Sequence, residues 1–437
     1  MVPHKTWPTE DLVGRLCHAL GIANNVIERL ATNGYTDEKH PAVNVRPEKL
    51  ISETALLAFV ASAVTDHRRV AESVESLVRL LIPHARSDKV LLGVCLHPAL
   101  ALDYAQGHVF LSMIGYPDRR FDRLLRQSIG SQAALGRERP PHRMLEQQWI
   151  MELWDGAAIK NLTSVRAMTS ASALNSPMDL LGASREDIYA FTHALMYVRR
   201  FNIRPLRMPR SNATIVAEVE AALSRCLDEQ DYDLAGELLL TWPLIGRPWS
   251  PVSTFGFRVL TSVEDEAGFL PTPSTRIDRI NALGAEERVD YLLATMYHTV
   301  YVMGLLCAAA LQPGCAPSLS IATANRTKGA AAALLERLSA DSDIPHWYSE
   351  MLKLTDRERD AIAGFLLSAA LRRRYLAQDY AGIRELLKVG LEFGLVKSPA
   401  ASQAGEMLER LATFAGIRAR ASNNIYAKRI ASKRISM

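Results

Sequence analysis

The sequence predicts an almost entirely α-helical protein, and two observations support this. Apolar residues recur at spacings of three and four along nearly the whole chain of 437 residues, and the alternating pattern of a half-buried strand is nearly absent. Turn residues rich in glycine and proline, such as 115–118 and 314–317, separate the apolar stretches. We therefore expect helical hairpins arranged as an α/α toroid or a solenoid-like bundle.

The first helix is expected to begin near Thr9–Asp11, where acids suit a helix N-terminus, and to end at Asn33–Gly34. A polar, proline-bearing loop follows over 35–47. The same spacing predicts further helices over 51–67, 69–83, 88–96, 98–114, 118–130, 142–155, 184–200, 212–228, 231–241, 252–266, 285–311, 324–340, 355–376, 378–393 and 400–416.

Two segments share a pattern typical of helical hairpins. Segments 226–240 and 375–387 both contain Gln-Asp-Tyr followed by a run of leucines, and 113–125 is a looser version. Each predicts a helix end, an Asp that caps the next helix, and leucines that face the core. Because the spacing between the copies is not constant, a regular repeat array is not predicted.

The charge pattern divides the chain. Residues 418–437 contain six basic residues and no acid, and without them the formal net charge falls from +4 to −2. We expect an N-terminal helical region over 1–135, a main helical toroid or bundle over 136–417 and a disordered basic tail over 418–437. Since the body is close to neutral and no helix-turn-helix stands out, we do not expect nucleic-acid binding.

The sequence favours a cytoplasmic protein. Its five cysteines are scattered and never form a CxxC pair, which fits a reducing compartment, and the first residues lack a secretory signal pattern. The most apolar stretch, 291–311, is interrupted by histidine, threonine and tyrosines. We interpret it as a buried core helix, and we expect no membrane span.

The common cofactor motifs are absent from the sequence. It contains no GxGxxG, Walker A, HExxH, paired ExxH, EF-hand, GxSxG or DDxxD pattern. We therefore expect no nucleotide, flavin or metal cofactor.

One candidate site is a stripe of three side chains on the helix expected at 184–200. Tyr189, His193 and Tyr197 are four residues apart and share one face. A histidine between two phenols can act as a base, although a hydrogen-bonded core histidine gives the same pattern.

A second candidate is Asp290, His298 and Tyr301 on the helix expected at 285–311. Titratable groups in so apolar a helix are costly unless they meet partners from another helix. If the two helices face each other, His193 and His298 share a pocket.

Two charged clusters are further candidates. Asp265 lies in the acidic turn 264–266, which a solvated loop explains equally well. One group of basic residues surrounds a Pro-Pro that begins a helix, and a second group follows residue 198. Each could bind an anion or an acidic partner protein, but a solvated surface explains them equally simply. These basic residues are Arg137, Arg139, His142, Arg143, Arg199, Arg200 and Arg204. His142 and Glu146 are also spaced like metal ligands, but two ligands do not make a site.

Segments 190–197, 232–243 and 264–271 resemble a poorly characterised helical family of actinobacterial specialised-metabolite clusters. Within it they are similar to the larger subunit of the aziridine- or azabicycle-forming enzymes of azinomycin-type pathways. The resemblance implies an intramolecular amine attack that expels a sulfate-like group from an amino acid on an acidic carrier protein. It also implies a smaller partner subunit and no redox cofactor.

These observations lead to one principal hypothesis and one rival. The principal hypothesis is a cofactor-independent tailoring enzyme of antibiotic-type metabolism, a cyclase that acts on a small molecule presented by a carrier protein. The rival is a non-catalytic helical-repeat scaffold that binds another protein. Convergence of His193 and His298 on one cavity would favour the enzyme.

Overall fold

The computed structural model describes residues 5–39, 41, 43–155, 162–203, 205–323, 327–338 and 345–434, with the backbone alone at 162–164 and 418–434. The described residues are mostly helical, which confirms the predicted class. The first helices are α1 (Thr9–Leu30), α2 (Pro47–Ala61), α3 (Arg68–Ala85), α4 (Asp88–Leu96), α5 (Ala101–Met113) and α6 (Arg119–Ile129). Two-residue strands β1 (Tyr35–Thr36) and β2 (Asn44–Val45) pair antiparallel within the loop after α1.

The middle of the chain contains the helices that build the site. They are α7 (Pro141–Asp155), α8 (Leu162–Ala171), α9 (Arg185–Arg199), α10 (Asn212–Asp228), α11 (Tyr232–Leu239), α12 (Thr241–Ile245), α13 (Pro251–Ala267), α14 (Ile277–Ala282) and α15 (Ala285–Ala310). The last part contains α16 (Ala330–Leu338), α17 (His346–Leu352), α18 (Asp356–Ala361), α19 (Ala363–Leu376), α20 (Tyr380–Glu392) and α21 (Pro399–Arg434). Short 3-10 turns are η1 (Ser62–Val64), η2 (Pro98–Leu100), η3 (Gln132–Leu135), η4 (Ala173–Asn175) and η5 (Arg200–Asn202).

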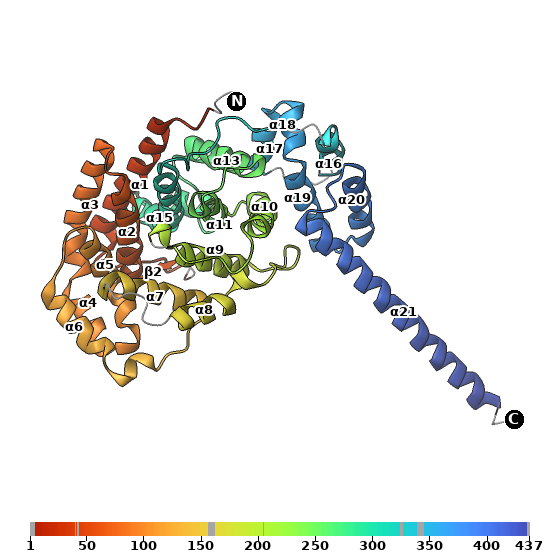
Figure 1. Ribbon diagram of the computed structural model, residues 1–437, viewed down its shortest axis with the longest axis horizontal. Coiled ribbons are helices and arrows are strands. Elements are labelled where there is room, and N and C mark those ends of the chain that lie inside the picture. Colours follow the sequence, from red (N-terminus) through yellow and green to blue (C-terminus); the bar gives the residue numbers. More distant parts are fainter. Residues whose placement is uncertain are drawn as a thin grey trace.

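The observed helices differ from the expected ones in three ways. Helices α8, α12, α14 and α17 were not predicted, because segments of five to ten residues carry too little apolar periodicity. The single helix expected at 355–376 is divided at Ile362 into α18 and α19. The tail, which we expected to be disordered, continues α21 as a helix through Arg434 and projects from the body (Figure 1).

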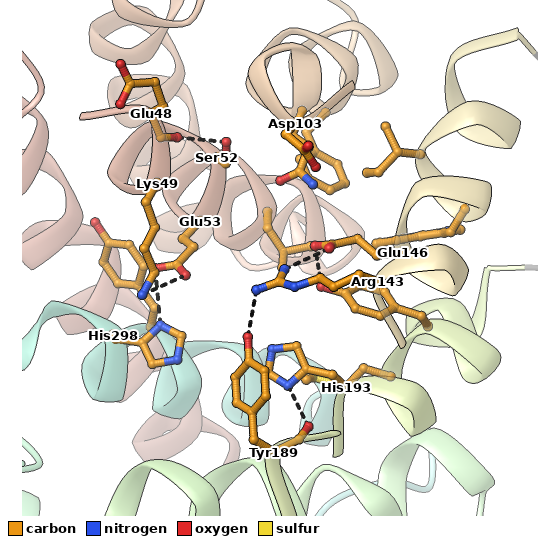
Figure 2. A pocket seen from close by; sticks show the side chains of 18 of the residues that line it. Glu48, Lys49, Ser52, Glu53, Asp103, Arg143, Glu146, Tyr189, His193 and His298 are labelled. Atoms are coloured by element: carbon orange, nitrogen blue, oxygen red, sulfur yellow. Dashed lines mark hydrogen bonds and ion pairs between the residues drawn. The ribbon is translucent and has the colours of Figure 1, made fainter. Parts of the chain in front are cut away.

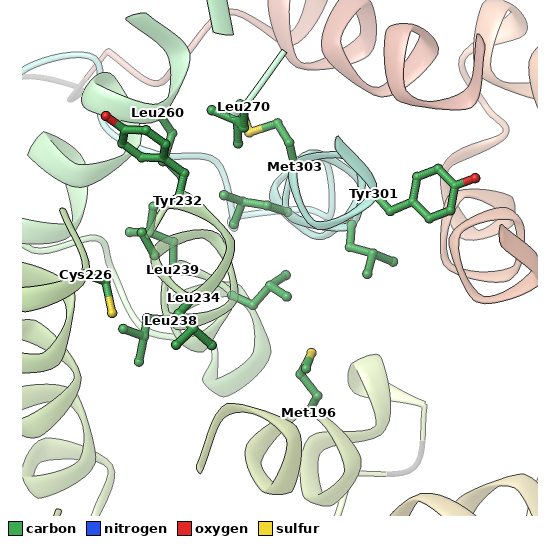
Figure 3. Packing of buried hydrophobic residues seen from close by; sticks show 14 of the residues in the cluster. Met196, Cys226, Tyr232, Leu234, Leu238, Leu239, Leu260, Leu270, Tyr301 and Met303 are labelled. Carbon is green, nitrogen blue, oxygen red and sulfur yellow. The ribbon is translucent and has the colours of Figure 1, made fainter. Parts of the chain in front are cut away.

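Helix α15 is the core helix of the part that contains the site. It packs against α1, α2 and α11. By length and composition α15 alone among the described helices is apolar enough to cross a membrane, but 89% of its most apolar window is buried inside the protein. Figure 3 shows apolar side chains of α9, α10, α13 and α15, including Met196 and Met303, gathered around α11 and its Leu234.

The two hairpins have the predicted Asp caps. Asp231 accepts a hydrogen bond from the Leu234 amide at 3.2 Å and Asp379 accepts one from the Gly382 amide at 2.8 Å. The residue before each cap is in the left-handed region, with φ of 55° at Gln230 and 54° at Gln378. The shared Gln-Asp-Tyr therefore specifies the same turn twice, and the first copy fixes where α11 begins.

Candidate active site

A cavity of about 670 Å³ lies between α2, α5, α7, α9, α11 and α15. Apolar side chains form one part of its wall, among them Leu56, Phe110, Trp149, Met196, Leu240 and Leu305. Charged and aromatic polar groups form the rest, as Figure 2 shows. A partly apolar cavity with a few converging polar groups is the usual form of a small-molecule site.

His193 and His298 both line this cavity. His193 is on α9 and His298 is on α15, so the hypothesis that the two histidines share a pocket agrees with the geometry. Tyr197 and Tyr301 also line it. Of the six residues in the two predicted tyrosine and histidine stripes, only Asp290 does not line the cavity, because its side chain faces α1 and pairs with Arg29 at 2.5 Å.

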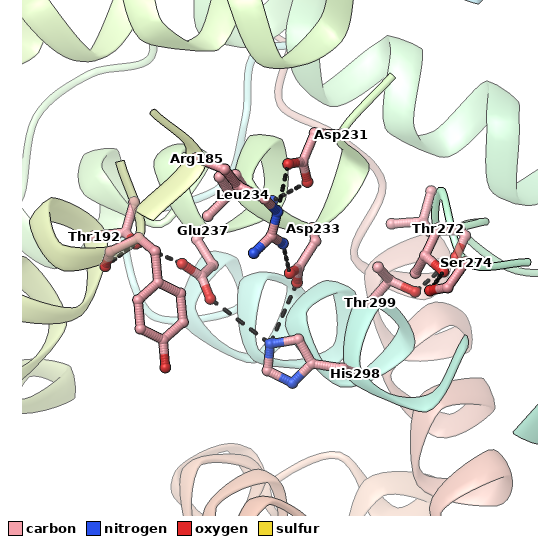
Figure 4. A network of polar contacts seen from close by, with 12 residues as sticks. Arg185, Thr192, Asp231, Asp233, Leu234, Glu237, Thr272, Ser274, His298 and Thr299 are labelled. Carbon is pink, nitrogen blue, oxygen red and sulfur yellow. Dashed lines mark hydrogen bonds and ion pairs between the residues drawn. The ribbon is translucent and has the colours of Figure 1, made fainter. Parts of the chain in front are cut away.

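Carboxylates surround His298 on both sides of its ring. Its Nδ1 lies 3.2 Å from Glu53 Oε2 on α2, and its Nε2 lies 3.3 Å from Asp233 Oδ1 and 3.8 Å from Glu237 Oε1 on α11 (Figure 4). Asp233 and Glu237 are four residues apart, so one face of α11 presents both carboxylates to α15. We call His298, Glu53, Asp233 and Glu237 the acidic cluster.

The electrostatics of the acidic cluster depend on this proximity. Burial by itself lowers the pKa of His298, but the charges of Asp233 and Glu53 raise the pKa well above its ordinary value. Burial by itself raises the pKa of Glu53, but His298 and Lys49 lower it to about 2. Burial, reinforced by the charge of Glu237, raises the pKa of Asp233 despite the opposing effect of His298. Perturbed carboxylates and a charged histidine in one cavity are typical of functional sites.

His193 is held against Tyr189, with ring centroids 3.7 Å apart. Its Nδ1 lies 3.1 Å from the Tyr189 carbonyl oxygen and 3.5 Å from Glu237 Oε2. Because both oxygens accept hydrogen bonds, Nδ1 carries the proton, and Nε2 is the nitrogen that can take up a proton in the neutral ring.

Arg143 on α7 provides positive charge at the opposite wall. It donates to Glu146 Oε2 at 2.8 Å and to the Tyr189 hydroxyl at 2.9 Å. The Tyr197 hydroxyl donates to the other Glu146 oxygen at 2.7 Å. Burial raises the pKa of both tyrosines, so both are neutral hydrogen-bonding groups at neutral pH.

The remaining residues of the first basic group also lie near the cavity. Arg137 is exposed and lines its rim, while Arg139 lines it and contacts Asp103 at 3.4 Å. The His142 ring lies 6.2 Å from the His193 ring. Burial, reinforced by the neighbouring His193, lowers the pKa of His142 to about 4, so His142 is neutral at neutral pH.

The second basic group does not form an anion site with the first. Arg199 donates to the Leu244 carbonyl at 2.8 Å, and Arg200 is buried with its guanidinium 2.6 Å from Glu152. Both therefore bind groups of the protein itself. Arg204 lies outside the described residues.

Asp265 lies away from the cavity, in a shallow depression between α1 and the end of α13. Its carboxylate pairs with Arg15 at 2.8 Å, and the neighbouring Glu264 pairs with the same guanidinium at 2.5 Å. Nothing in the described residues joins this turn to His193 or His298.

Glu53, Asp233 and Glu237 were not predicted as site residues from the sequence. A signal for two of them was present in the segment 232–240, where two acids four residues apart interrupt an otherwise apolar run. Such acids are costly in a core helix unless a partner meets them. Asp233, Glu237 and His298 also offer ligand atoms that lie within 4.8 Å of one another, a separation that one metal ion can bridge.

One comparison with known proteins gave a match. The profile of a family described as a domain of unknown function, DUF6895, matches residues 18–308, a range that contains the whole cavity wall. No curated protein and no solved structure matches the chain.

Proposed function

The chain belongs to the DUF6895 family, a domain of unknown function, and we propose that its cavity is the active site of a small-molecule enzyme. The observation that carries the proposal is the convergence of two histidines and two acids from α2, α9, α11 and α15 on one cavity of about 670 Å³. Burying that many titratable groups is unfavourable for stability alone, whereas acid–base chemistry requires it.

The proposed roles follow from the two charged walls. His193 is the general base, because its Nδ1 proton is fixed by the Tyr189 carbonyl and Nε2 is left to accept a proton. Arg143 and the rim arginine Arg137 bind an anionic group of the substrate. The apolar wall formed by Trp149 and Leu305 excludes water from the reacting groups.

The resemblance narrows this proposal to a tailoring cyclase of antibiotic-type metabolism. An amine that attacks within the same molecule needs a base for its proton and cations for the departing anion, and His193 and Arg143 are suited to these tasks. The acidic carrier protein, the smaller partner subunit and the α/α toroid or solenoid-like arrangement belong to the same proposal. Arg137 is an exposed arginine of the cavity lining, and we expect Arg137→Glu to weaken carrier binding.

The test is turnover of metabolites by the purified protein. We expect incubation with fractionated cell extract to consume at least one anionic metabolite, measured by mass spectrometry, and His193→Ala to slow this by about 100-fold or more. His346→Ala is the matched control, because His346 contacts Ser262 and Glu266 away from the cavity. Equal turnover by the His193 variant would contradict the assignment. Stable capture of a protein partner without any turnover would favour the scaffold instead.

A further inference from the structure

We propose that Asp233, Glu237 and His298 bind a divalent transition-metal ion, for which Zn²⁺ is the probe. The three inner atoms are Asp233 Oδ1, Glu237 Oε1 and His298 Nε2. The distances from Nε2 to the two oxygens, 3.3 and 3.8 Å, are close to those between ligands that each lie about 2.1 Å from one ion. One imidazole and two carboxylates form a mixed donor set that suits zinc, iron or manganese.

The outer oxygen of each of the two proposed carboxylate ligands is held by a second residue (Figure 4). Arg185 donates to Asp233 Oδ2 at 2.6 Å, and Thr192 donates to Glu237 Oε2 at 2.5 Å. Outer partners of this kind orient metal ligands, so the inner oxygens of both carboxylates are directed to a common point.

Glu53 does the same for the histidine. It lies 3.2 Å from His298 Nδ1, so this nitrogen donates its proton and the lone pair of the neutral ring is on Nε2. A carboxylate behind a histidine, with the metal in front, is a recurrent arrangement in metal sites. The order of groups from α2 through α15 to α11 is therefore carboxylate, imidazole, ion and two carboxylates.

An independent observation is the state of Asp233 Oδ1. Asp233 is 8% exposed, and its buried Oδ1 faces His298 Nε2 at 3.3 Å but accepts no hydrogen bond from any described residue. A buried carboxylate oxygen that accepts no hydrogen bond is costly. A bound cation at the inner position satisfies it.

The position of the site relative to the cavity indicates what the ion does. His298 and Glu237 line the cavity, and three protein ligands leave coordination positions open, as in catalytic metal sites. The ion would polarise an oxygen of the bound substrate. This role rests on the proposed function, whereas metal binding itself does not. The sequence contains no metal-binding motif, so these three ligands could not be identified from it.

Metal binding is tested on the full chain after chelator treatment. We expect about one equivalent of Zn²⁺ by calorimetry and elemental analysis, and Co²⁺ to give a visible absorption band from bound nitrogen and oxygen ligands. Asp233→Asn, Glu237→Gln and His298→Gln should each weaken Zn²⁺ binding by about 100-fold or more, and Glu53→Gln by about 10- to 100-fold. Glu264→Gln is the control, since it changes a buried acid in the other acidic group.

The outcomes separate the two proposals. The metal site would be overturned if the wild-type protein bound neither Zn²⁺ nor Co²⁺ stoichiometrically. It would also be overturned if Glu264→Gln lost as much Zn²⁺ affinity as the ligand variants. The Co²⁺ spectrum keeps the test decisive if a ligand variant does not fold, because it needs only the wild-type protein. Turnover by the metal-free protein overturns the catalytic role of the ion alone, and bound metal without any turnover overturns the proposed function alone.

Discussion

At the scale of single residues, the two cavity histidines differ in what holds Nδ1. In His193 the closer partner of Nδ1 is the neutral Tyr189 carbonyl oxygen at 3.1 Å, with the Glu237 carboxylate at 3.5 Å, whereas in His298 the partner of Nδ1 is the Glu53 carboxylate at 3.2 Å. A carboxylate partner stabilises positive charge on the ring or on an ion bound to its far nitrogen, whereas a carbonyl partner mainly fixes the tautomer. This difference assigns base chemistry to His193 and cation binding to His298.

A third histidine allows a pH prediction away from the cavity. His108 is completely buried, accepts from Arg86 at 3.2 Å and contacts Asp122 at 2.9 Å. Burial, reinforced by Arg86, lowers the pKa of His108 despite the opposing effect of Asp122. Below pH 6.5 His108 therefore becomes protonated in the unfolded chain while it stays neutral in the folded chain. Protonation stabilises the unfolded chain, so the folded protein loses stability as the pH falls from 6.5 towards the folded pKa.

We expect the contribution of His108 to the free energy of unfolding of the wild-type protein to decrease between pH 7 and pH 5. His108→Gln removes the titrating group, so the difference in free energy of unfolding between this variant and the wild type should change across this pH range. The measurement is urea unfolding at several pH values. Parallel curves for the two proteins would show that His108 titrates alike in the folded and unfolded chains.

The sequence identified only part of the site at this scale. His193, Tyr197 and His298 were recognisable because they interrupt apolar helices at helical spacing, and Arg143 because it belongs to the basic residues beside a Pro-Pro helix start. Glu53 was not, because its role depends on His298, which is 245 residues away in the chain. A single sequence contains no information on which distant side chains meet. Local spacing likewise placed Asp290 with His298, although Arg29 of another helix binds Asp290.

At the scale of elements, capping and hairpin patterns were the most predictable features. The Asp caps at Asp231 and Asp379 follow from local hydrogen bonding, so the sequence is sufficient to predict them. Helix α12, Thr241–Ile245, was not predictable, because five residues with an internal proline carry no helical period. Its position is determined by packing against α9, α10 and α15.

The close approach of α15 to α1 and α2 gives a prediction at this scale. A Cβ on Gly304 would lie 2.8 Å from Ala19 Cβ and 2.9 Å from Leu57 Cδ1. The Ala19 methyl group is fixed to its backbone, so the helices must separate to accept it. We expect Gly304→Ala to lower the free energy of unfolding by about 1–3 kcal/mol, measured by denaturant unfolding.

Gly21→Ala is the matched control within α1. A Cβ there meets nothing within 4 Å, so the change should raise stability by about 0.5–1 kcal/mol through helix propensity. Stabilisation by both substitutions would mean that α15 does not lie this close to α1.

At the scale of the whole molecule, the site and the last helices are separate parts of the chain. The cavity wall lies within 44–305, inside the range that matches the DUF6895 family, whereas α16–α21 follow that range. The two parts are joined by partly buried polar contacts: Arg373 binds both oxygens of Asp228 at 2.7 and 2.8 Å, and the Trp347 indole donates to Asp228 at 3.0 Å. The last helices therefore support the body without lining the cavity.

Helix α21 provides a prediction on how far this support extends. Among the side chains of α21 that the structure describes, 399–417, the buried ones are Ala400, Ala401, Ala404 and Met407, in the first three turns. Gln403 adds two contacts, since it accepts from the Leu180 amide at 2.8 Å and donates to the Met178 carbonyl at 2.7 Å. Truncation after residue 417 should therefore leave the melting temperature unchanged, whereas truncation after residue 398 should lower it.

Gln403→Ala tests the same contact without shortening the chain. It leaves the Leu180 amide and the Met178 carbonyl without this partner, and we expect a loss of about 1–3 kcal/mol in denaturant unfolding. Because both partners precede α9, the loss also measures how firmly α21 is attached to the segment that leads into the site. A melting temperature that falls as much after truncation at 417 as at 398 would place the stabilising contacts beyond Met407, in the projecting part of the helix.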